Sequence, residues 1–205
     1  MDTLLTGLAV FPIAYLAGSL PTAYLLTRLV KGIDIRTVGS RNPGAVNVFR
    51  EVAPWAGVTV LGVDTLKGAA VMLAILGLNM GDYAMFVGGL AVVAGHNWPI
   101  FLGFHGGKGV AAILGLSLAV LPLWTLLALA LSLSFGFVTR NVVFGIAAGI
   151  VAINTFTIAT SQGTAQIGLC LTLSALVIAT HYALTYRAVV SSVQRRGPWG
   201  LFETE

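Results

Sequence analysis

Long apolar stretches alternate with short polar segments along the whole chain. The apolar stretches cover residues 4–29, 55–78, 84–96, 110–138, 142–159 and 165–186. At 1.5 Å per residue, about 20 helical residues cross the roughly 30 Å hydrocarbon core of a bilayer, and most of these stretches have a suitable length. The pattern therefore predicts an all-α, polytopic membrane protein.

Two prolines interrupt this pattern. Pro21 lies inside the first stretch and predicts a kink there. Residues 110–138 could form one long helix or two short helices broken near Pro122. A hairpin returns Arg140 to the side that carries Lys108, as expected where basic residues mark the cytoplasmic face. We therefore predict the hairpin, about seven spans in total, an external N-terminus and a cytoplasmic C-terminus.

The charged residues are few, and they are placed unevenly. Of 205 residues, 57% are hydrophobic and 9% are charged, whereas soluble domains carry about 25% charged residues. Under the predicted topology, all 11 lysines and arginines lie on or near the cytoplasmic side, including Arg187, Arg195 and Arg196 in the tail. The formal charge of +4 is thus a topology signal, and no nucleic-acid partner is expected. We predict one membrane domain over residues 1–205, in the inner (plasma) membrane.

The sequence offers no pattern for a metal or a cofactor. Cys170 is the only cysteine and lies in an apolar stretch, so there is neither a disulfide framework nor a zinc motif. The first residues, MDTLLTGLAVF, contain no basic segment, so we do not expect a cleaved signal peptide.

The densest polar chemistry lies in residues 95–110, GHNWPIFLGFHGGKGV. Here Gly103, Gly106, Gly107 and Gly109 surround Lys108. Glycine-rich turns let backbone N–H groups converge on an anion, and a lysine ammonium adds a point charge. This reading competes with a plain turn at the membrane face, where lysine is also common. A nucleotide-binding P-loop is disfavoured, because that motif needs Ser or Thr directly after the lysine.

A second polar segment, residues 31–51, contains the stretch GSRNPGAVNVFR. It is predicted to be a loop. Gly44 permits a tight turn, Ser40 offers a hydroxyl, Asn42 and Asn47 offer amides, and Arg50 offers a forked guanidinium suited to phosphate oxygens. An Asx-turn loop with an interfacial anchor arginine is an equally open interpretation.

Polar residues also occur inside or at the ends of the apolar stretches. Asp64 and Lys67 stand three apart, share a helix face and are predicted to form a structural pair. His96 and His105 are candidate general bases, although a helix cap or an interface anchor explains either one. His181 ends the last stretch at the same predicted face.

At these residues the chain resembles the PlsY family of bacterial acyl-phosphate:glycerol-3-phosphate acyltransferases. The match runs through AYLAGSLPTAYLL, GSRNPGAVNVFR, DTLKG and GHNWPIFLGFHGGKGVAA, in order, over roughly the first 115 residues. The resemblance implies a seven-helix fold and transfer of a fatty acyl group from acyl phosphate to the 1-hydroxyl of glycerol 3-phosphate, giving lysophosphatidic acid. It implies that Ser40, Arg50 and Lys108 contact substrate phosphate, and that Asn42, Asn47 and the Gly106-Gly107 turn shape the pocket.

The second half departs from the family pattern. Thr139 and Arg140 are retained, but Val143 and Ile146 stand where the family shows hydroxyl residues. His181 matches a family histidine, whereas Leu184 replaces the asparagine expected three residues later, and the Gly-x-Glu ending is degraded to RRGPWGLFETE. These differences leave open whether glycerol 3-phosphate is still the acceptor.

Several alternatives follow from the same residues. A transporter or anion carrier would also place charges among spans, but it would more often show internal repeats, and none is visible. A catalytically weak homologue is the second alternative. The base that removes the hydroxyl proton is His96, His105 or, as we favour, a phosphate oxygen of bound substrate. Ser40 lacks the surroundings of a nucleophile elbow, and no histidine has the Asp five residues on that a His-x4-Asp mechanism needs.

Overall fold

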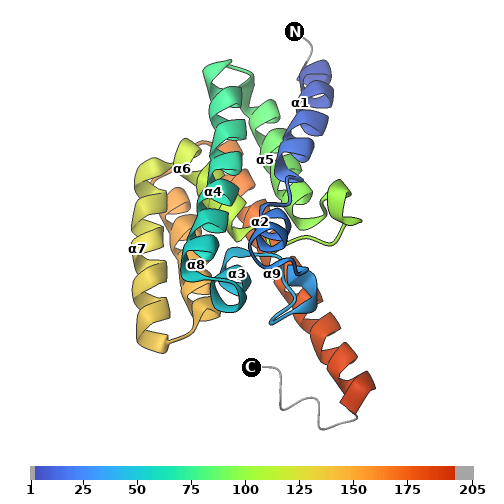
Figure 1. The fold of residues 1–205 in the computed structure, drawn as a ribbon. Helices are drawn as coiled ribbons and strands as arrows, with labels where there is room; N and C mark the ends of the chain where they lie inside the picture. The colour runs from blue at the N-terminus through green and yellow to red at the C-terminus, as the bar shows by residue number, and fades with distance from the viewer. Residues whose placement is uncertain (1–2, 197–205) are drawn as a thin grey trace.

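The computed structural model describes residues 3–196, and every regular element in this range is a helix (Figure 1). The longer helices are α1 Thr3–Gly18, α4 Pro54–Gly77, α5 Gly81–Asn97, α7 Pro122–Thr139, α8 Val142–Ala159 and α9 Thr164–Arg196. The shorter elements are α2 Thr22–Lys31, α3 Ala45–Glu51, α6 Val110–Val120 and the 3₁₀ turns η1 Ile35–Thr37 and η2 Ile100–Leu102. The predicted all-α fold class is confirmed. Arg187, Arg195 and Arg196 have no described side chains, and the degraded ending lies largely outside the described residues.

Helix α5 forms the centre of the molecule. It packs against α1, α4, α6 and α9. Of the most apolar 18 residues in the segment that contains α5, Gly81–Leu102, 61% are buried inside the protein, whereas the same share is 11% for α7 and 17% for α8. The main core collects small and aliphatic side chains from these central helices: Val10, Ala14, Met72, Ile75, Ala84, Met85, Ala91, Val92, Val93, Ala112, Leu116, Leu169 and Leu173. Helices α7 and α8 pack chiefly against each other at the side of this core (Figure 1).

The outer surface of the bundle is apolar, as expected of a protein in lipid. Large hydrophobic side chains are exposed on every long helix, for example Ile13 at 70% and Phe137 at 83%. Six described segments are long and apolar enough to cross a membrane: Leu5–Lys31, Pro54–Gly77, Gly81–Leu102, Pro122–Thr139, Val142–Ala159 and Thr164–Tyr186. Helix α6 has 11 residues and reaches about 16 Å, too short to cross a bilayer alone. The count of seven spans therefore stays a prediction.

Basic residues gather toward one end of the bundle. The α4–α5 turn lies at the same end as the start of α1, whereas α2, α3 and the α7–α8 turn lie toward the other end (Figure 1). The end with α2, α3 and the α7–α8 turn carries Arg28, Lys31, Arg50 and Arg140, whereas the α4–α5 turn contains no lysine or arginine. This separation supports the charge-based topology, and which end faces the cytoplasm stays a prediction.

Pro21 and Pro122 both mark breaks between helices. Around Pro21 the prediction of a kink was too mild, because α1 ends at Gly18 and α2 begins a new helix at Thr22. At Pro122 the predicted break is confirmed, since α6 ends at Val120 and α7 starts with the proline in its first turn. Proline fits a first helical turn because its missing N–H has no intrahelical partner there.

The polar segment 31–51 was predicted to be a loop, and this prediction was only partly right. Residues 45–51 form α3, which places Asn47 and Arg50 on a helix. The helix forms because Gly44 adopts an extended conformation at its N-cap and Val48 is fully buried. Periodicity could not reveal α3, because seven residues give only two turns.

Glycine permits close backbone contact between α4 and α6. A Cβ at Gly68 would lie 2.1 Å from the carbonyl oxygen of Ala112, and a Cβ at Gly115 would lie 1.8 Å from that of Thr65. In membranes, such small residues let two helices approach and gain van der Waals contact. These glycines hold α6, and the segment before it, beside the middle of α4.

We expect Gly68→Ala to lower the free energy of unfolding by about 1–3 kcal/mol, because the added methyl group must push α6 away. Gly62→Ala is the matched control on the same helix, since nothing lies within 4 Å of the position of its Cβ. Thermal unfolding in detergent measures both variants. Equal melting temperatures for the two would contradict this packing argument.

Candidate functional site

The glycine turn at residues 106–109 folds back onto the end of α5. The N–H of Gly106 donates to the carbonyl of Asn97 at 3.1 Å, and the N–H of Gly107 donates to the carbonyl of His96 at 3.1 Å. A Cβ would lie 2.2 Å from the His96 oxygen at Gly106 and 2.4 Å from His96 Nε2 at Gly107. Only glycine therefore allows this approach. Gly109 has a φ of +81° and starts α6.

These hydrogen bonds contradict the prediction that the N–H groups of the glycine turn converge on an anion. The N–H groups of Gly106 and Gly107 already have partners in α5, so they are not free to bind a ligand. The first N–H groups of α6 have no intrahelical acceptor, because the first such bond runs from Ile113 to Gly109. The donors left for an anion are therefore those at the start of α6, next to Lys108.

Lys108 meets a residue from the far end of the chain. Its Nζ lies 2.9 Å from His181 Nδ1 on α9, in a partly buried position. A lysine ammonium has no acceptor, so it donates to this nitrogen, and His181 is neutral with its proton on Nε2. Burial lowers the pKa of Lys108 below its ordinary value. Two of the three ammonium protons remain available for an anion.

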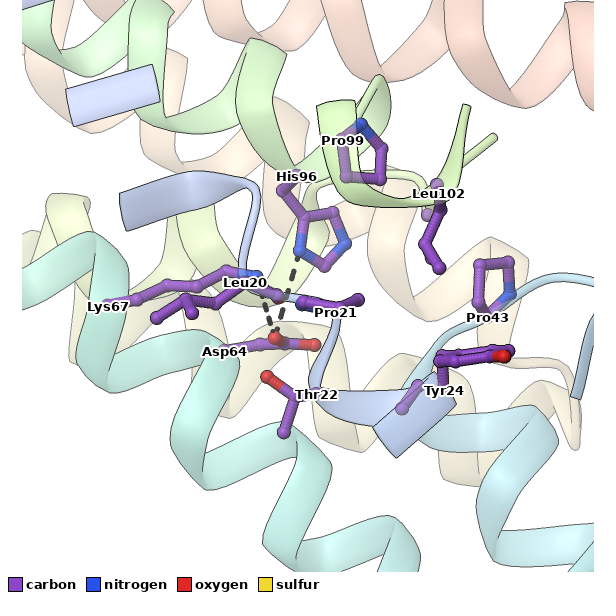
Figure 2. A pocket seen from close by; sticks show the side chains of 13 residues that line it. Leu20, Pro21, Thr22, Tyr24, Pro43, Asp64, Lys67, His96, Pro99 and Leu102 are labelled. Carbon is purple, nitrogen blue, oxygen red and sulfur yellow. Dashed lines mark hydrogen bonds and ion pairs between the residues drawn. The ribbon is translucent and has the colours of Figure 1, made fainter. Parts of the chain in front are cut away.

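Asp64, Lys67 and His96 form a buried polar cluster beneath the glycine turn. Lys67 Nζ and Asp64 Oδ1 lie 2.8 Å apart, which confirms the predicted pair, and His96 Nδ1 lies 3.8 Å from the same oxygen. Figure 2 shows the ammonium and the imidazole both pointing at Asp64. Lys67 also donates to the carbonyl of Leu20, at the α1–α2 break, at 3.3 Å.

The cluster borders a cavity of about 20 Å³, also lined by Pro21, Pro43, Gly106 and Gly107 (Figure 2). This volume admits roughly one water molecule and no substrate. Within residues 3–196, no group of three or more His, Cys, Asp or Glu side chains is arranged to hold a metal ion.

Asn47 fixes the loop that carries Ser40. Its side-chain oxygen accepts the N–H of Ser40 at 3.0 Å, and its Nδ2 donates to the carbonyls of Ile35 at 3.2 Å and Val38 at 3.1 Å. Asn47 is buried, and these bonds occupy both ends of its amide. It therefore shapes the loop, whereas the Ser40 side chain stays exposed.

The other predicted residues divide between shaping the loop and facing solvent. Asn42 is partly buried next to Gly44, where a Cβ would lie 2.8 Å from its Nδ2. His105 is exposed, and its Nδ1 pairs with the carbonyl oxygen of Gly103 at 2.6 Å. Arg50 is exposed on α3.

Arg36 joins the two polar segments, a role that the sequence did not reveal. Its guanidinium binds the Asp34 carboxylate at 2.8 to 3.2 Å, lies 5.2 Å from the ring centre of Tyr24 and donates to the carbonyl of Leu102 at 3.2 Å. The hydrogen bonds from Arg36 hold the pKa of Asp34 below its ordinary value, and the carboxylate raises the pKa of Arg36. Asp34 and Arg36 stand two apart in the motif DIR, which is the one signal in the sequence.

For the acyl transfer that the sequence resemblance implies, we expect Arg36→Met to lower kcat/KM by about three- to tenfold, as for the loss of one or two hydrogen bonds at a partly exposed site. Because Arg36 lowers the pKa of Asp34, the Asp34–Arg36 ion pair is fully formed at any pH above about 4, the ordinary carboxyl pKa. The ion pair is lost only as the pH falls through the lowered pKa of Asp34. Arg28→Met is the control, since Arg28 donates to the carbonyl of Gly32 at its own helix end and, among the described residues, makes no hydrogen bond to Asp34 or Leu102. Equal kcat/KM values for the two variants would show that the Arg36 contacts between the two polar segments do not matter for activity.

Comparison with known proteins gives one consistent family. A family model described as glycerol-3-phosphate acyltransferase matches residues 8–189. Glycerol-3-phosphate acyltransferase 4 of Dehalococcoides mccartyi is 45% identical over 130 residues, which cover 63% of this chain and 56% of that relative. Glycerol-3-phosphate acyltransferase of Geobacter sulfurreducens is 39% identical over 178 residues, covering 87% of this chain and 91% of that relative.

The fold is also that of a solved membrane protein. The crystal structure of PlsY (YgiH), an integral membrane glycerol 3-phosphate acyltransferase, in its glycerol 3-phosphate form matches with a TM-score of 0.82 and 32% identity. The match covers 90% of this chain and 92% of that chain. The lysophosphatidic acid form of the same protein matches with a TM-score of 0.80 at 30% identity.

Proposed function

The chain belongs to the glycerol-3-phosphate acyltransferase family, and from this premise we propose that it transfers a fatty acyl group to the 1-hydroxyl of glycerol 3-phosphate, giving lysophosphatidic acid. The family membership confirms the resemblance drawn from the sequence motifs. The chain is an integral membrane protein of several spans. We further propose acyl phosphate as the donor and an active site that faces the cytoplasm across the inner membrane.

One observation carries this proposal: Lys108 lies at the start of α6 and is held by His181 from α9. An ammonium beside the free N–H groups of a helix start is suited to a phosphate group. Arg50, with its guanidinium exposed on α3, and Ser40, on the adjoining loop, supply further contacts to a phosphorylated substrate.

The main requirement of the reaction is that the negative charge of the two substrates is neutralised. Acyl phosphate is a mixed anhydride, so its carbonyl carbon is attacked by the acceptor hydroxyl, a new C–O ester bond forms and the bond to phosphate breaks. Lys108 and Arg50 offset the repulsion between two polyanionic substrates and stabilise the leaving phosphate. The hydroxyl proton passes to a phosphate oxygen, whose second pKa near 6 suits this role.

The acceptor is the least constrained part of the proposal. Leu184 lies one helical turn after His181 on α9, at the position where the sequence resemblance implies an asparagine. Val143 and Ile146 lie in the first turns of α8. These positions offer no side-chain hydrogen bond to a polyol, and a different polyol phosphate as acceptor is therefore included in the test.

The test is acyl transfer by the purified protein in detergent, followed by mass spectrometry. Palmitoyl phosphate and palmitoyl-CoA are offered as donors against glycerol 3-phosphate and a panel of other polyol phosphates. We expect lysophosphatidic acid from palmitoyl phosphate alone. Activity with the thioester alone would reassign the donor. Substrate binding without conversion would favour an anion carrier or a catalytically weak homologue, because detergent leaves no compartment to transport into.

A further inference from the structure

The Asp64–Lys67–His96 cluster takes no part in the proposed transfer, yet it lies directly under the glycine turn. The side chains of Asp64, Lys67 and His96 are 3%, 6% and 8% exposed. Charged groups inside membrane-spanning segments are costly and are kept where they have a role. Pairing explains how Asp64 and Lys67 tolerate burial, but it does not explain why a histidine joins them beside this turn.

His96 supports the turn with both its backbone and its side chain. Its carbonyl accepts the N–H of Gly107, and its Nε2 would lie 2.4 Å from a Cβ at that residue. The three atoms nearest to that Cβ position all belong to the imidazole ring. The orientation of the ring therefore decides where the peptide before Lys108 lies.

Asp64 in turn fixes the imidazole. His96 Nδ1 faces Asp64 Oδ1 at 3.8 Å and has no hydrogen-bond partner within the described residues, whereas Asp64 Oδ1 is already paired with Lys67. The adjoining cavity of about 20 Å³ can admit one water molecule to bridge them. Lys67 anchors the carboxylate from the other side, and its bond to the carbonyl of Leu20 ties this group to the α1–α2 break.

We propose that Asp64 and His96 are positioning residues: Asp64 orients the imidazole of His96, and the imidazole holds Gly107 so that Lys108 faces the substrate phosphate. The inference rests on the proposed function, because its effect is read through glycerol 3-phosphate binding. Neither side chain touches the substrate. The histidine that the sequence offered as a base thus acts as a support for the lysine.

The first experiment compares two replacements of His96 by the KM for glycerol 3-phosphate and by kcat. His96→Asn keeps a donor near the position of Nδ1 and should stay within about threefold of the wild type. His96→Leu removes the donor and should raise KM about tenfold while kcat changes less, because the side chain can no longer interact with the Asp64 carboxylate 3.8 Å away. Asn154→Leu is the control, because it also removes a partly buried polar group, which is bonded to Ser174 in the α8–α9 interface and not to Asp64 or His96, and it should leave KM unchanged.

The second experiment tests the contact itself by a double-mutant cycle. Gly107→Ala places a methyl group against the imidazole and should raise KM about tenfold or more. Asparagine is shorter than histidine and does not reach the position of Nε2, so Gly107→Ala combined with His96→Asn should recover KM to within about threefold of His96→Asn alone. Such non-additivity is not expected from two changes that merely loosen the fold.

Each result bears on the inference separately from the function. Wild-type protein without any transfer activity overturns the proposed function. Active wild type with an unchanged KM in His96→Leu, or additive effects in the cycle, overturns the positioning role. Loss of activity that follows the loss of folded protein in size-exclusion chromatography, with an unchanged KM, also overturns it.

Discussion

Replacing Lys108 by methionine should abolish acyl transfer while the protein still inserts and folds. Methionine keeps the length of the side chain but removes the ammonium that lies 2.9 Å from His181 Nδ1. Loss of one preorganised charged donor at developing negative charge typically costs about 10²–10³ in kcat. We expect at least this loss in the detergent assay. The matched control is Lys31→Met, because Lys31 is exposed and donates only to the carbonyl of Glu51, at 2.6 Å.

The pH dependence offers an independent check on Lys108. Burial lowers its pKa, so activity that needs the ammonium is present below the lowered pKa and is lost as pH rises through it. An exposed lysine would lose its charge only at higher pH, near 10.4. Lys108→Arg should move the alkaline limb upward, since guanidinium stays charged, with a lower maximal rate from the altered geometry. An alkaline limb that does not move, or wild-type turnover in Lys108→Met, would remove this lysine from the mechanism.

Breaking the buried pair from one side should destabilise the protein strongly, by about 3–5 kcal/mol. Asp64→Asn leaves the ammonium of the buried Lys67 without an anion. Lys67→Met leaves the carboxylate without a cation. The double variant removes both charges and should recover most of the lost stability, because a neutral pair of similar volume has no desolvation cost to offset.

Thermal unfolding in detergent measures all three variants against the wild type. The expected pattern is two low melting temperatures and one close to the wild-type value. If the double variant were as unstable as the sum of the single variants, the pair would not be coupled, and the 2.8 Å contact would have no energetic weight.

The sequence predicted the helices well, because hydrophobic length is a strong signal in membrane proteins. The helix break at Pro122 and the Asp64–Lys67 pair follow from local rules on proline and on i, i+3 spacing. The start of a new helix after Pro21 and the existence of α3 were missed. Both depend on packing between segments, such as the burial of Val48, which short windows of sequence do not report.

The candidate site was predictable in its residue types and less so in its contacts. Lys108 and His181 are 73 residues apart, and no spacing rule joins them. Asp64 lies on α4 and His96 on α5, 32 residues apart, and the two side chains meet because these helices pack against each other. The role of the glycines was also misread, since Gly106 and Gly107 direct their N–H groups to α5 and not to a ligand.

The contact between Lys108 and α9 also has a consequence for biosynthesis. A nascent chain that has inserted only as far as α8 already carries the glycine turn, the buried pair and Arg50, but it lacks His181. Until α9 joins the bundle, Lys108 lacks the His181 acceptor, and the proposed anion site is incomplete. The proposed phosphate site is therefore completed only when α9 packs against helices that are already inserted, so a late insertion step sets the geometry of Lys108.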